Sequence, residues 1–188
     1  LFLYVPFNGG HSPMQLPESY MASYAGMKEN RRKLAGMLSA WDESIGQIVA
    51  SLEEAGQRSS TLILFSADNG GPNPVALSDN GELRAGKGTI YEGGIRVGAF
   101  ANWPGHVPAG ITVKEPMHAV DWFPTLVKLA GGSLEQKLPL DGRDVWPMIT
   151  QGAKSPHEAI LLVSSPTRAA VRMGDWKLLS NATKKDGE

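Results

Sequence analysis

The sequence contains no cysteine among its 188 residues. This absence excludes disulfide bonds, thiolate metal sites and a cysteine nucleophile within the chain. Long apolar runs are also absent, since none approaches the roughly 20 residues that a membrane-spanning helix needs. The net charge is only -1, and the lysines and arginines are dispersed, so no basic surface of the kind that binds nucleic acid is indicated. With 41% hydrophobic and 20% charged residues, the chain has the composition of a folded globular domain.

The first third of the sequence has the pattern of an α/β fold. Residues 1–7 form an apolar run that ends in a turn-prone segment at residues 8–10, as expected of a buried strand. Because the chain starts as if midway through that strand, we expect it to be a piece of a longer protein. Between residues 30 and 56, apolar side chains recur at three- and four-residue spacing, which predicts an amphipathic helix that ends at Gly56. The apolar run at residues 61–66 is typical of a parallel strand covered on both faces, so the order strand, helix, strand predicts a right-handed crossover.

The remaining two thirds begin with a long loop and end in shorter strands. Residues 67–94 are rich in glycine, and long ordered loops usually carry function. The elements predicted after this loop are a strand at 97–103, a helix at 121–130, and strands at 159–163, 168–173 and 176–180. A two-residue turn at Gly174 and Asp175 predicts an antiparallel hairpin. The pattern predicts an α/β domain over residues 1–150 and the start of a smaller antiparallel subdomain over residues 151–188.

Asp68 and Asn69 lie directly after the strand predicted at residues 61–66. In open α/β sheets, ligands bind beyond the carboxyl ends of the strands. A carboxylate beside an amide oxygen suits Ca²⁺ or Mg²⁺ better than a soft metal. The triplet Asp-Asn-Gly is also a common turn sequence. The residues alone therefore leave two interpretations open, a metal site and a structural turn.

Lys87 lies in a glycine-rich stretch, residues 81–89, that approaches the spacing of a phosphate-binding P-loop. A P-loop needs a preceding strand, a Ser or Thr directly after the lysine, and a following helix. Here a polar loop precedes, Gly88 follows the lysine, and Gly93 and Gly94 are expected to break any helix, so the P-loop is rejected. Two interpretations remain: a lysine that places a point charge on a sulfate or phosphate oxygen, and an ordinary solvated lysine.

His11 follows the first predicted strand, and it would reach the same rim as Asp68 if the two strands were neighbours. An imidazole there could bind an oxyanion or give a proton to a leaving alcohol. The alternative is a surface or capping histidine. His106, His118 and His157 have no comparable setting, and the sequence has neither a Gly-x-Ser-x-Gly elbow nor a His-Glu-x-x-His helix, which argues against serine hydrolases and zinc proteases.

Taken together, these motifs resemble the sulfatase family of the alkaline-phosphatase superfamily. The stretches that carry the resemblance are, in chain order, residues 7–13, 62–71, 83–96, 103–105, 121–130 and 140–142. The segment at residues 121–129 (Asp-Trp-Phe-Pro-Thr-Leu-Val-Lys-Leu) is similar to the arylsulfatase B branch. The resemblance implies part of an alkaline-phosphatase-like mixed sheet flanked by helices, with the start of a small C-terminal antiparallel subdomain.

The same resemblance implies roles for the candidate residues. Asp68 and Asn69 would be ligands of a single Ca²⁺, with Mg²⁺ as the alternative cation. Lys87 and His11 would contact the sulfate, and His11 could also protonate the leaving group. A cation and a lysine there would stabilise charge on the sulfuryl oxygens as the ester bond breaks. The implied substrate is a sulfated small molecule or a sulfated glycan, and the implied location is periplasmic, secreted or lysosomal.

One component of the family's site is expected outside this chain. Sulfatases use a formylglycine made from a Cys or Ser in a Cys/Ser-x-Pro-x-Arg motif, and we expect this chain to lack that motif. The resemblance implies that the motif, the family's paired aspartates and its second lysine and histidine lie upstream of the first residue. Residues 1–188 alone are therefore expected to bind Ca²⁺ weakly and not to hydrolyse sulfate esters, whereas the parent protein would. Two alternatives remain open: a phosphate or phosphonate ester hydrolase of the same superfamily, and a non-catalytic relative that binds sulfated glycans.

Overall fold

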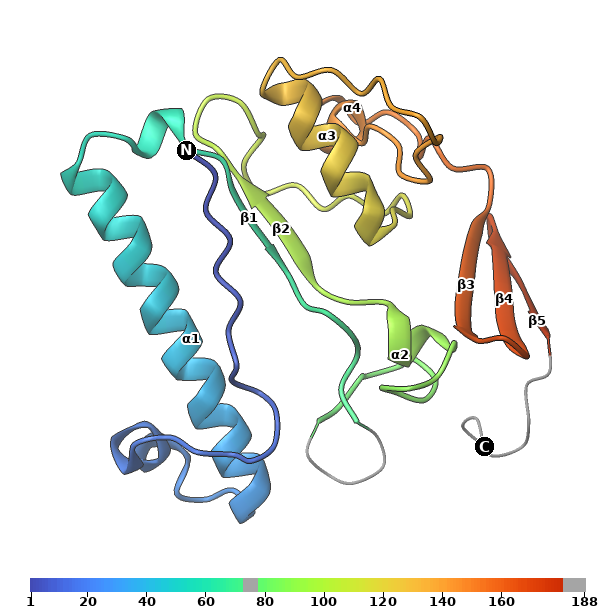
Figure 1. Ribbon diagram of the computed structural model, residues 1–188. Helices are drawn as coiled ribbons and strands as arrows, with labels where there is room; N and C mark the ends of the chain where they lie inside the picture. The colour runs from blue at the N-terminus through green and yellow to red at the C-terminus, as the bar shows by residue number, and fades with distance from the viewer. Residues whose placement is uncertain (73–77, 181–188) are drawn as a thin grey trace. The chain divides into compact units, whose positions relative to one another are not determined.

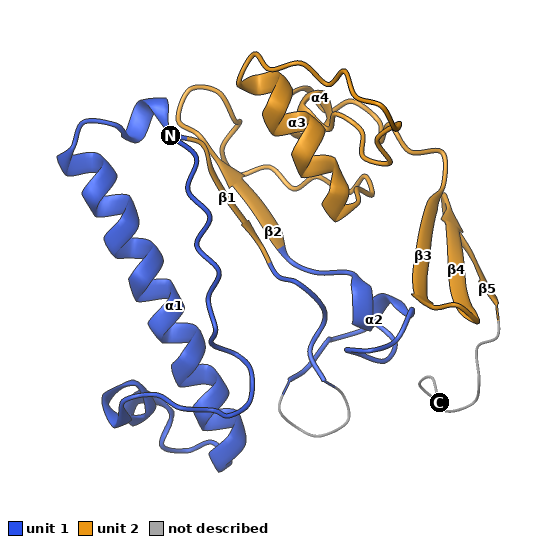
Figure 2. Cartoon of the chain, in the orientation of Figure 1, with its two compact units in different colours: residues 1–61, 67–98, 185–188 blue, residues 62–66, 99–184 orange. Residues whose placement is uncertain are grey.

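The computed structural model describes residues 1–72 and 78–180 of the chain. The chain separates into two compact units, which Figure 2 shows in different colours. Among the described residues, unit 1 comprises residues 1–61 and 67–98, and unit 2 comprises residues 62–66 and 99–180. Within the described part, no helix combines the length and the apolar character that a membrane crossing needs.

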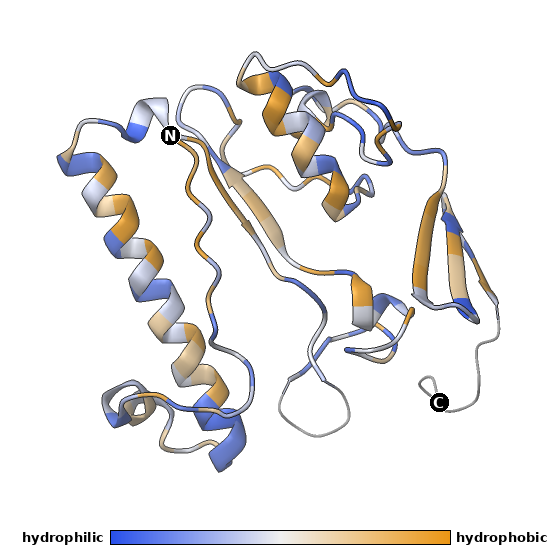
Figure 3. Ribbon diagram, viewed as in Figure 1, coloured by the Kyte–Doolittle hydropathy of each residue, from blue (hydrophilic) through white to orange (hydrophobic). Residues whose placement is uncertain are grey.

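Unit 1 is built around a long helix, α1 (Glu29–Glu54), which confirms the helix predicted at residues 30–56. Apolar and polar residues alternate along it (Figure 3), as the spacing in the sequence requires. The short 3-10 helix η1 (Glu18–Tyr24) packs beside its first half (Figure 1). Gly56 ends the helix region with a φ of 66°, a left-handed conformation that glycine adopts without steric cost. A second 3-10 helix, η2 (Arg58–Ser60), follows it.

The strand predicted at residues 1–7 is wrong. These residues form no ladder with any strand in the described part of the chain, and the side chains of residues 1–5 are exposed. Phe7 packs on α1, with its ring centroid 5.8 Å from that of Trp41. A strand exists only where a neighbour receives its backbone hydrogen bonds, and an apolar run does not show whether that neighbour is present. The predicted crossover from this strand is therefore not formed either.

Unit 2 contains β1 (Ile63–Ser66) and β2 (Ala99–Asn102), which confirm the strands predicted at 61–66 and 97–103. Their pairing differs from the prediction: they are antiparallel, with Phe65 opposite Phe100, and the first three residues of β1 are only half-buried. The two rings stack with centroids 4.9 Å apart. A short apolar run does not distinguish a parallel central strand from a half-covered antiparallel one.

The core of unit 2 lies around two helices and the loops that join them. The predicted helix at 121–130 is confirmed as the 3-10 turn η3 (Ala119–Asp121) followed by α3 (Trp122–Leu129). The helix α4 (Trp146–Gln151) has no counterpart in the prediction, because six residues are too few for a helical period to show. Buried residues at the core are Val145, Met148 and Ile149, with Ala101, Val107, Met117 and Trp122 packed against them.

The chain continues into a three-stranded antiparallel meander, β3 (Ile160–Ser165), β4 (Arg168–Met173) and β5 (Trp176–Ser180). All three strands and the hairpin turn between the last two confirm the prediction. The turn glycine, Gly174, has a φ of 53°, as a tight hairpin turn requires. The mixed α/β class is therefore confirmed, while the domain boundary placed at residue 150 stays a prediction.

Candidate functional site

Asp68 and Asn69 lie just after β1, as the sequence predicts, and they belong to unit 1. The Asp68 side chain is exposed, and among the described residues no hydrogen bond or ion pair engages its carboxylate. Asn69 is half-buried, and its Nδ2 donates a hydrogen bond to the carbonyl oxygen of Gly70 at 2.8 Å. Because Nδ2 makes this bond, the amide oxygen of Asn69 remains as a second oxygen, beside the Asp68 carboxylate, that could bind a cation.

The backbone of Gly71 joins this segment to the loop that carries Lys87. The backbone N–H of Lys87 donates to the carbonyl oxygen of Gly71 at 3.1 Å. One residue earlier, the N–H of Gly70 donates to the carbonyl oxygen of Gly94 at 3.0 Å. The backbone of Lys87 is therefore bonded to Gly71, which lies only two residues after Asn69. The Lys87 side chain is exposed. The structure therefore brings together three of the four residues singled out from the sequence.

Glycines allow the two loops to approach this closely. A Cβ added at Gly70 would collide with the carbonyl oxygen of Gly93, and one added at Gly93 would collide with that of Ala85. Ala85 itself has a φ of 61°, in the left-handed region that costs a residue with a side chain roughly 1–2 kcal/mol. Arg84 lies over the ring of Tyr91, with Cζ 4.1 Å from the centroid, which orders the loop from its outer side.

One helical turn, α2 (Glu92–Ile95), corrects the expectation that Gly93 and Gly94 break any helix. Both glycines are buried in this turn, because their missing side chains let it pack against the backbone of the loop before it. The turn starts five residues after Lys87. The P-loop interpretation stays rejected, because a P-loop lysine is followed directly by its helix.

His11, the fourth candidate, is not joined to the others. It is exposed, and its Nδ1 lies 2.9 Å from the carbonyl oxygen of Ser12. The preceding Gly9 and Gly10 lie against the indole of Trp41 on α1, where an added Cβ would meet the ring. Within the described residues, no hydrogen bond or ion pair links His11 to Asp68, Asn69 or Lys87.

Asp68 and Asn69 provide only two side-chain oxygen groups for a cation. Ca²⁺ takes six to eight oxygen ligands, and the described residues contain no group of three or more His, Asp or Glu side chains that could hold a metal. The carboxylate and the amide oxygen fit a hard cation in kind. In number they fit only part of its coordination sphere, and further oxygens must come from other chain segments or from water.

A buried carboxylate in unit 2 was not singled out from the sequence. Asp121 is 0% exposed and accepts three hydrogen bonds: from the backbone N–H of His118 at 2.6 Å, from that of Arg143 at 2.8 Å and from His157 Nε2 at 2.7 Å. The pair Asp121 and His157 therefore ties three separate segments together. Their separation of 36 residues leaves no local signal in the sequence.

The spacing Ser-x-Pro-x-Arg does occur in this chain, at residues 164–168, which corrects the expectation that the chain lacks it. These residues run from the end of β3 through the turn to the first residue of β4, and the ladder is irregular between Val163 and Ser165. The Ser165 hydroxyl accepts a hydrogen bond from the Thr167 N–H at 3.4 Å, as a turn residue does. The hairpin accounts for this match to the spacing.

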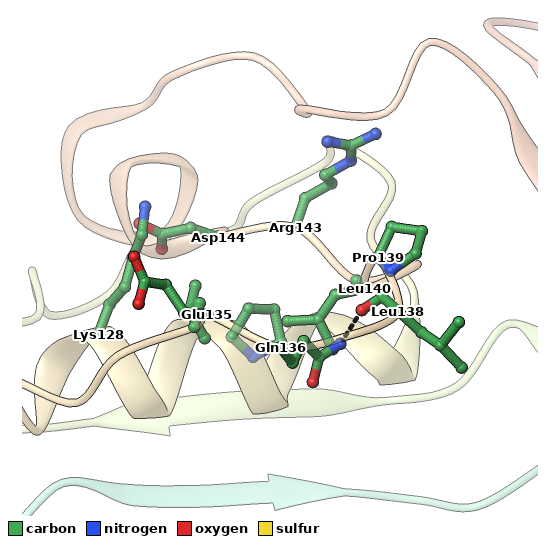
Figure 4. Close-up of a pocket in the computed structure, with 11 residues that line it drawn as sticks. Lys128, Glu135, Gln136, Leu138, Pro139, Leu140, Arg143 and Asp144 are labelled. Atoms are coloured by element: carbon green, nitrogen blue, oxygen red, sulfur yellow. Dashed lines mark hydrogen bonds and ion pairs between the residues drawn. The ribbon is translucent and has the colours of Figure 1, made fainter.

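An open hollow of about 450 Å³ lies between α3 and residues 134–144 of unit 2 (Figure 4). Lys128 and Asp144 form an ion pair across part of it, with Nζ 3.1 Å from Oδ2. Its other charged lining residues are Glu135 and Arg143, so positive and negative charges balance. None of the residues singled out from the sequence lines the hollow, and its lining has no net charge that would select an anion.

Comparison with known proteins decides the family. Residues 1–133 match the sequence model of the family described as Sulfatase. The chain belongs to the sulfatase family. Arylsulfatase J of Mus musculus is 40% identical to it over 177 residues, which are 94% of this chain and 29% of that protein. Arylsulfatase A of Homo sapiens is 35% identical over 184 residues, covering 94% of this chain and 35% of that protein.

Solved structures agree with this assignment of the sulfatase chain. The structure of Ps i-CgsB in complex with k-i-k-neocarrahexaose has a TM-score of 0.84 and 38% identity, over 90% of this chain and 39% of that one. The PsFucS1 sulfatase from Pseudoalteromonas sp. has a TM-score of 0.77 and 30% identity, over 89% and 33% of the two chains. The fold is therefore that of the alkaline-phosphatase-like sulfatases. The chain spans about a third of the length of the curated relatives that it matches.

Proposed function

We propose that this sulfatase chain supplies the cation- and sulfate-binding part of an arylsulfatase-like sulfuric ester hydrolase. The observation that carries the proposal is the hydrogen bond from the Lys87 N–H to the Gly71 oxygen. It connects Lys87, in the glycine-rich stretch at residues 81–89, to the Asp68 and Asn69 segment. A carboxylate and an ammonium group on bonded backbone segments can bind a cation and an anion side by side. A sulfate ester that lies against a cation needs both groups.

The chemistry follows from the types of side chain. The Lys87 ammonium would donate hydrogen bonds to the sulfuryl oxygens and stabilise their charge as the ester bond breaks. Asp68 and Asn69 would hold Ca²⁺, with Mg²⁺ as the alternative, and the bound cation supplies positive charge that polarises the same oxygens. Water and the sulfate ester then yield an alcohol and hydrogen sulfate. The leaving oxygen needs a proton, which His11 would donate.

The nucleophile is proposed to lie outside residues 1–188. In the sulfatase family it is a formylglycine, and the Ser-x-Pro-x-Arg spacing of this chain is used in the β3–β4 turn. We therefore assign turnover to a longer protein that contains this chain. The substrate class is a sulfated glycan or a sulfated small molecule. Support comes from relatives named arylsulfatase and N-acetylgalactosamine-6-sulfatase, and from the structural neighbour Ps i-CgsB, which was solved in complex with k-i-k-neocarrahexaose.

Kinetics of the longer protein test this proposal. With an aryl sulfate as substrate, we expect Lys87→Ala to lower kcat/KM by about 10²–10³-fold, the loss seen when one preorganised donor to a developing oxyanion is removed. Lys114→Ala is the matched control, since Lys114 is an exposed lysine of unit 2, and it should leave kcat/KM unchanged. Removal of divalent cations with a chelator should abolish turnover, and Ca²⁺ should restore it.

The same assay separates the rival hydrolase. A phosphate or phosphonate ester hydrolase would turn over the matching aryl phosphate faster than the aryl sulfate, and that result would refute the sulfatase activity. Equal turnover by Lys87→Ala and Lys114→Ala would refute the role of Lys87. For residues 1–188 alone, we expect no turnover and only weak Ca²⁺ binding in titration calorimetry, because the two side-chain donors found here fill only part of a coordination sphere.

A further inference from the structure

Asn80 makes an unusually complete set of hydrogen bonds for a loop residue. Its Oδ1 accepts from the backbone N–H of Gly71 at 3.0 Å. Its Nδ2 donates to the carbonyl oxygen of the same Gly71 at 3.0 Å and to that of Ala85 at 2.9 Å. The side chain is half-buried. Both amide hydrogens and the oxygen are therefore engaged, which is close to all that one asparagine can make.

These bonds join the two halves of the candidate site. Gly71 ends the segment that carries Asp68 and Asn69, and Ala85 lies two residues before Lys87. The carbonyl oxygen of Gly71 that receives the Asn80 amide also receives the Lys87 N–H at 3.1 Å. Asn80 therefore fixes the same peptide group that fixes the Lys87 backbone.

The contact with Ala85 supports this arrangement at its most strained point. Ala85 has a φ of 61°, which an alanine keeps only when the surrounding structure holds it. The Asn80 Nδ2 bonds its carbonyl oxygen, and this oxygen precedes the turn in which Lys87 sits. Without the bond, relaxation of Ala85 to a right-handed conformation would redirect the chain just before Lys87.

We propose that Asn80 is a positioning residue that sets the place of Lys87 relative to Asp68 and Asn69, so that the ammonium meets a sulfate held beside the cation. This inference rests on the proposed function, and it assigns to Asn80 no contact with substrate. Only an asparagine side chain can make all three hydrogen bonds at this position. Aspartate keeps the acceptor for the Gly71 N–H but loses both donors, and alanine loses all three bonds.

The experiment uses the longer protein and compares Asn80→Ala and Asn80→Asp with Asp79→Ala. Asp79 is a matched control, because its Oδ1 bonds the N–H of Gly81 at 2.8 Å inside the same loop and bridges nothing else among the described residues. We expect both Asn80 variants to lower kcat about 10- to 100-fold, the range for a catalytic group displaced by about 1 Å. KM should change far less, and Asp79→Ala should match the wild type.

A double-mutant cycle distinguishes positioning from general destabilisation. If Asn80 acts through Lys87, then Asn80→Ala should have almost no further effect on kcat once Lys87→Ala is present. If the fold-loss of kcat in the double variant equals the product of the losses in the two single variants, the inference is overturned. Hydrogen exchange provides a readout that needs no turnover: the Lys87 amide should exchange at least about 10-fold faster in Asn80→Ala, because a bond lost from a loop lowers its local opening free energy.

The outcomes separate this inference from the proposed function. An unchanged kcat in Asn80→Ala, with Lys87→Ala impaired, would overturn the positioning role and leave the proposed function standing. An unchanged kcat in Lys87→Ala would overturn the proposed function, and the positioning of Lys87 for sulfate with it. Unchanged exchange at the Lys87 amide in both Asn80 variants would refute the geometric basis of the inference, whatever the kinetics show.

Discussion

Removal of the Asp121 carboxylate should be among the most destabilising single changes in the chain. Asp121→Ala leaves three donors without their acceptor: the N–H groups of His118 and Arg143 and the Nε2 of His157. Each unsatisfied buried donor costs about 1–3 kcal/mol, although such costs do not add fully. Breaking a buried acid–base pair costs about 3–5 kcal/mol in total. We expect a loss of that size, which is a large fraction of the 5–15 kcal/mol typical of whole domains.

Urea unfolding followed by tryptophan fluorescence measures this loss, because Trp122 packs against the same core. Asp141→Ala is the matched control, since Asp141 is exposed, and its unfolding free energy should stay within about 0.5 kcal/mol of the wild type. If Asp121→Ala does not fold, Asp121→Asn and His157→Ala remain measurable, and each should lose less. A loss in Asp121→Ala no larger than that in Asp141→Ala would refute the reasoning.

Two further predictions concern helix α1 and a surface ion pair. Gly46→Ala should raise the free energy of unfolding by about 0.5–1 kcal/mol, because its added Cβ meets nothing and glycine disfavours a helix interior. Gly36→Ala should lower it by about 1–3 kcal/mol, because its Cβ would meet the Leu16 side chain and the backbone of Tyr20 in η1; urea titrations that shift both variants in the same direction would contradict this contrast. The hydrogen bond from Lys154, with a second from the Ser155 N–H, holds the pKa of Glu115 below its ordinary value. Its stabilising contribution is therefore present above the unfolded-state pKa and is lost as pH falls through the folded-state pKa. In Lys154→Met, an NMR titration should show the Glu115 pKa rising toward its ordinary value, and an unchanged pKa would be inconsistent with the ion pair.

Much of the fold could be predicted because its signals are local. The helix α1 has 26 residues, enough turns for its apolar spacing to be unmistakable, and the hairpin between β4 and β5 is marked by its glycine turn. The predictions of a strand at residues 1–7 and of parallel pairing for β1 were wrong for the same reason. An apolar run shows that residues can be buried, but only distant residues decide which neighbour buries them.

The residues of the candidate site could also be predicted only in part. Asp68, Asn69 and Lys87 could be singled out because a carboxylate after a strand and a lysine between glycines have recognisable chemistry. Asn80 could not, because in the sequence it belongs to an ordinary turn, and its function depends on contacts nine and five residues away that only the folded loop creates.

A crystal structure of the longer protein with Ca²⁺ and a slowly hydrolysed aryl sulfate would test the central claim most directly. Asp68 Oδ and Asn69 Oδ1 should lie about 2.3–2.6 Å from the ion, the range for calcium and oxygen. Lys87 Nζ should lie about 2.7–2.9 Å from a sulfuryl oxygen, as in a charge-assisted hydrogen bond. An ion bound to other side chains, or a sulfate out of reach of Lys87, would contradict the proposed site.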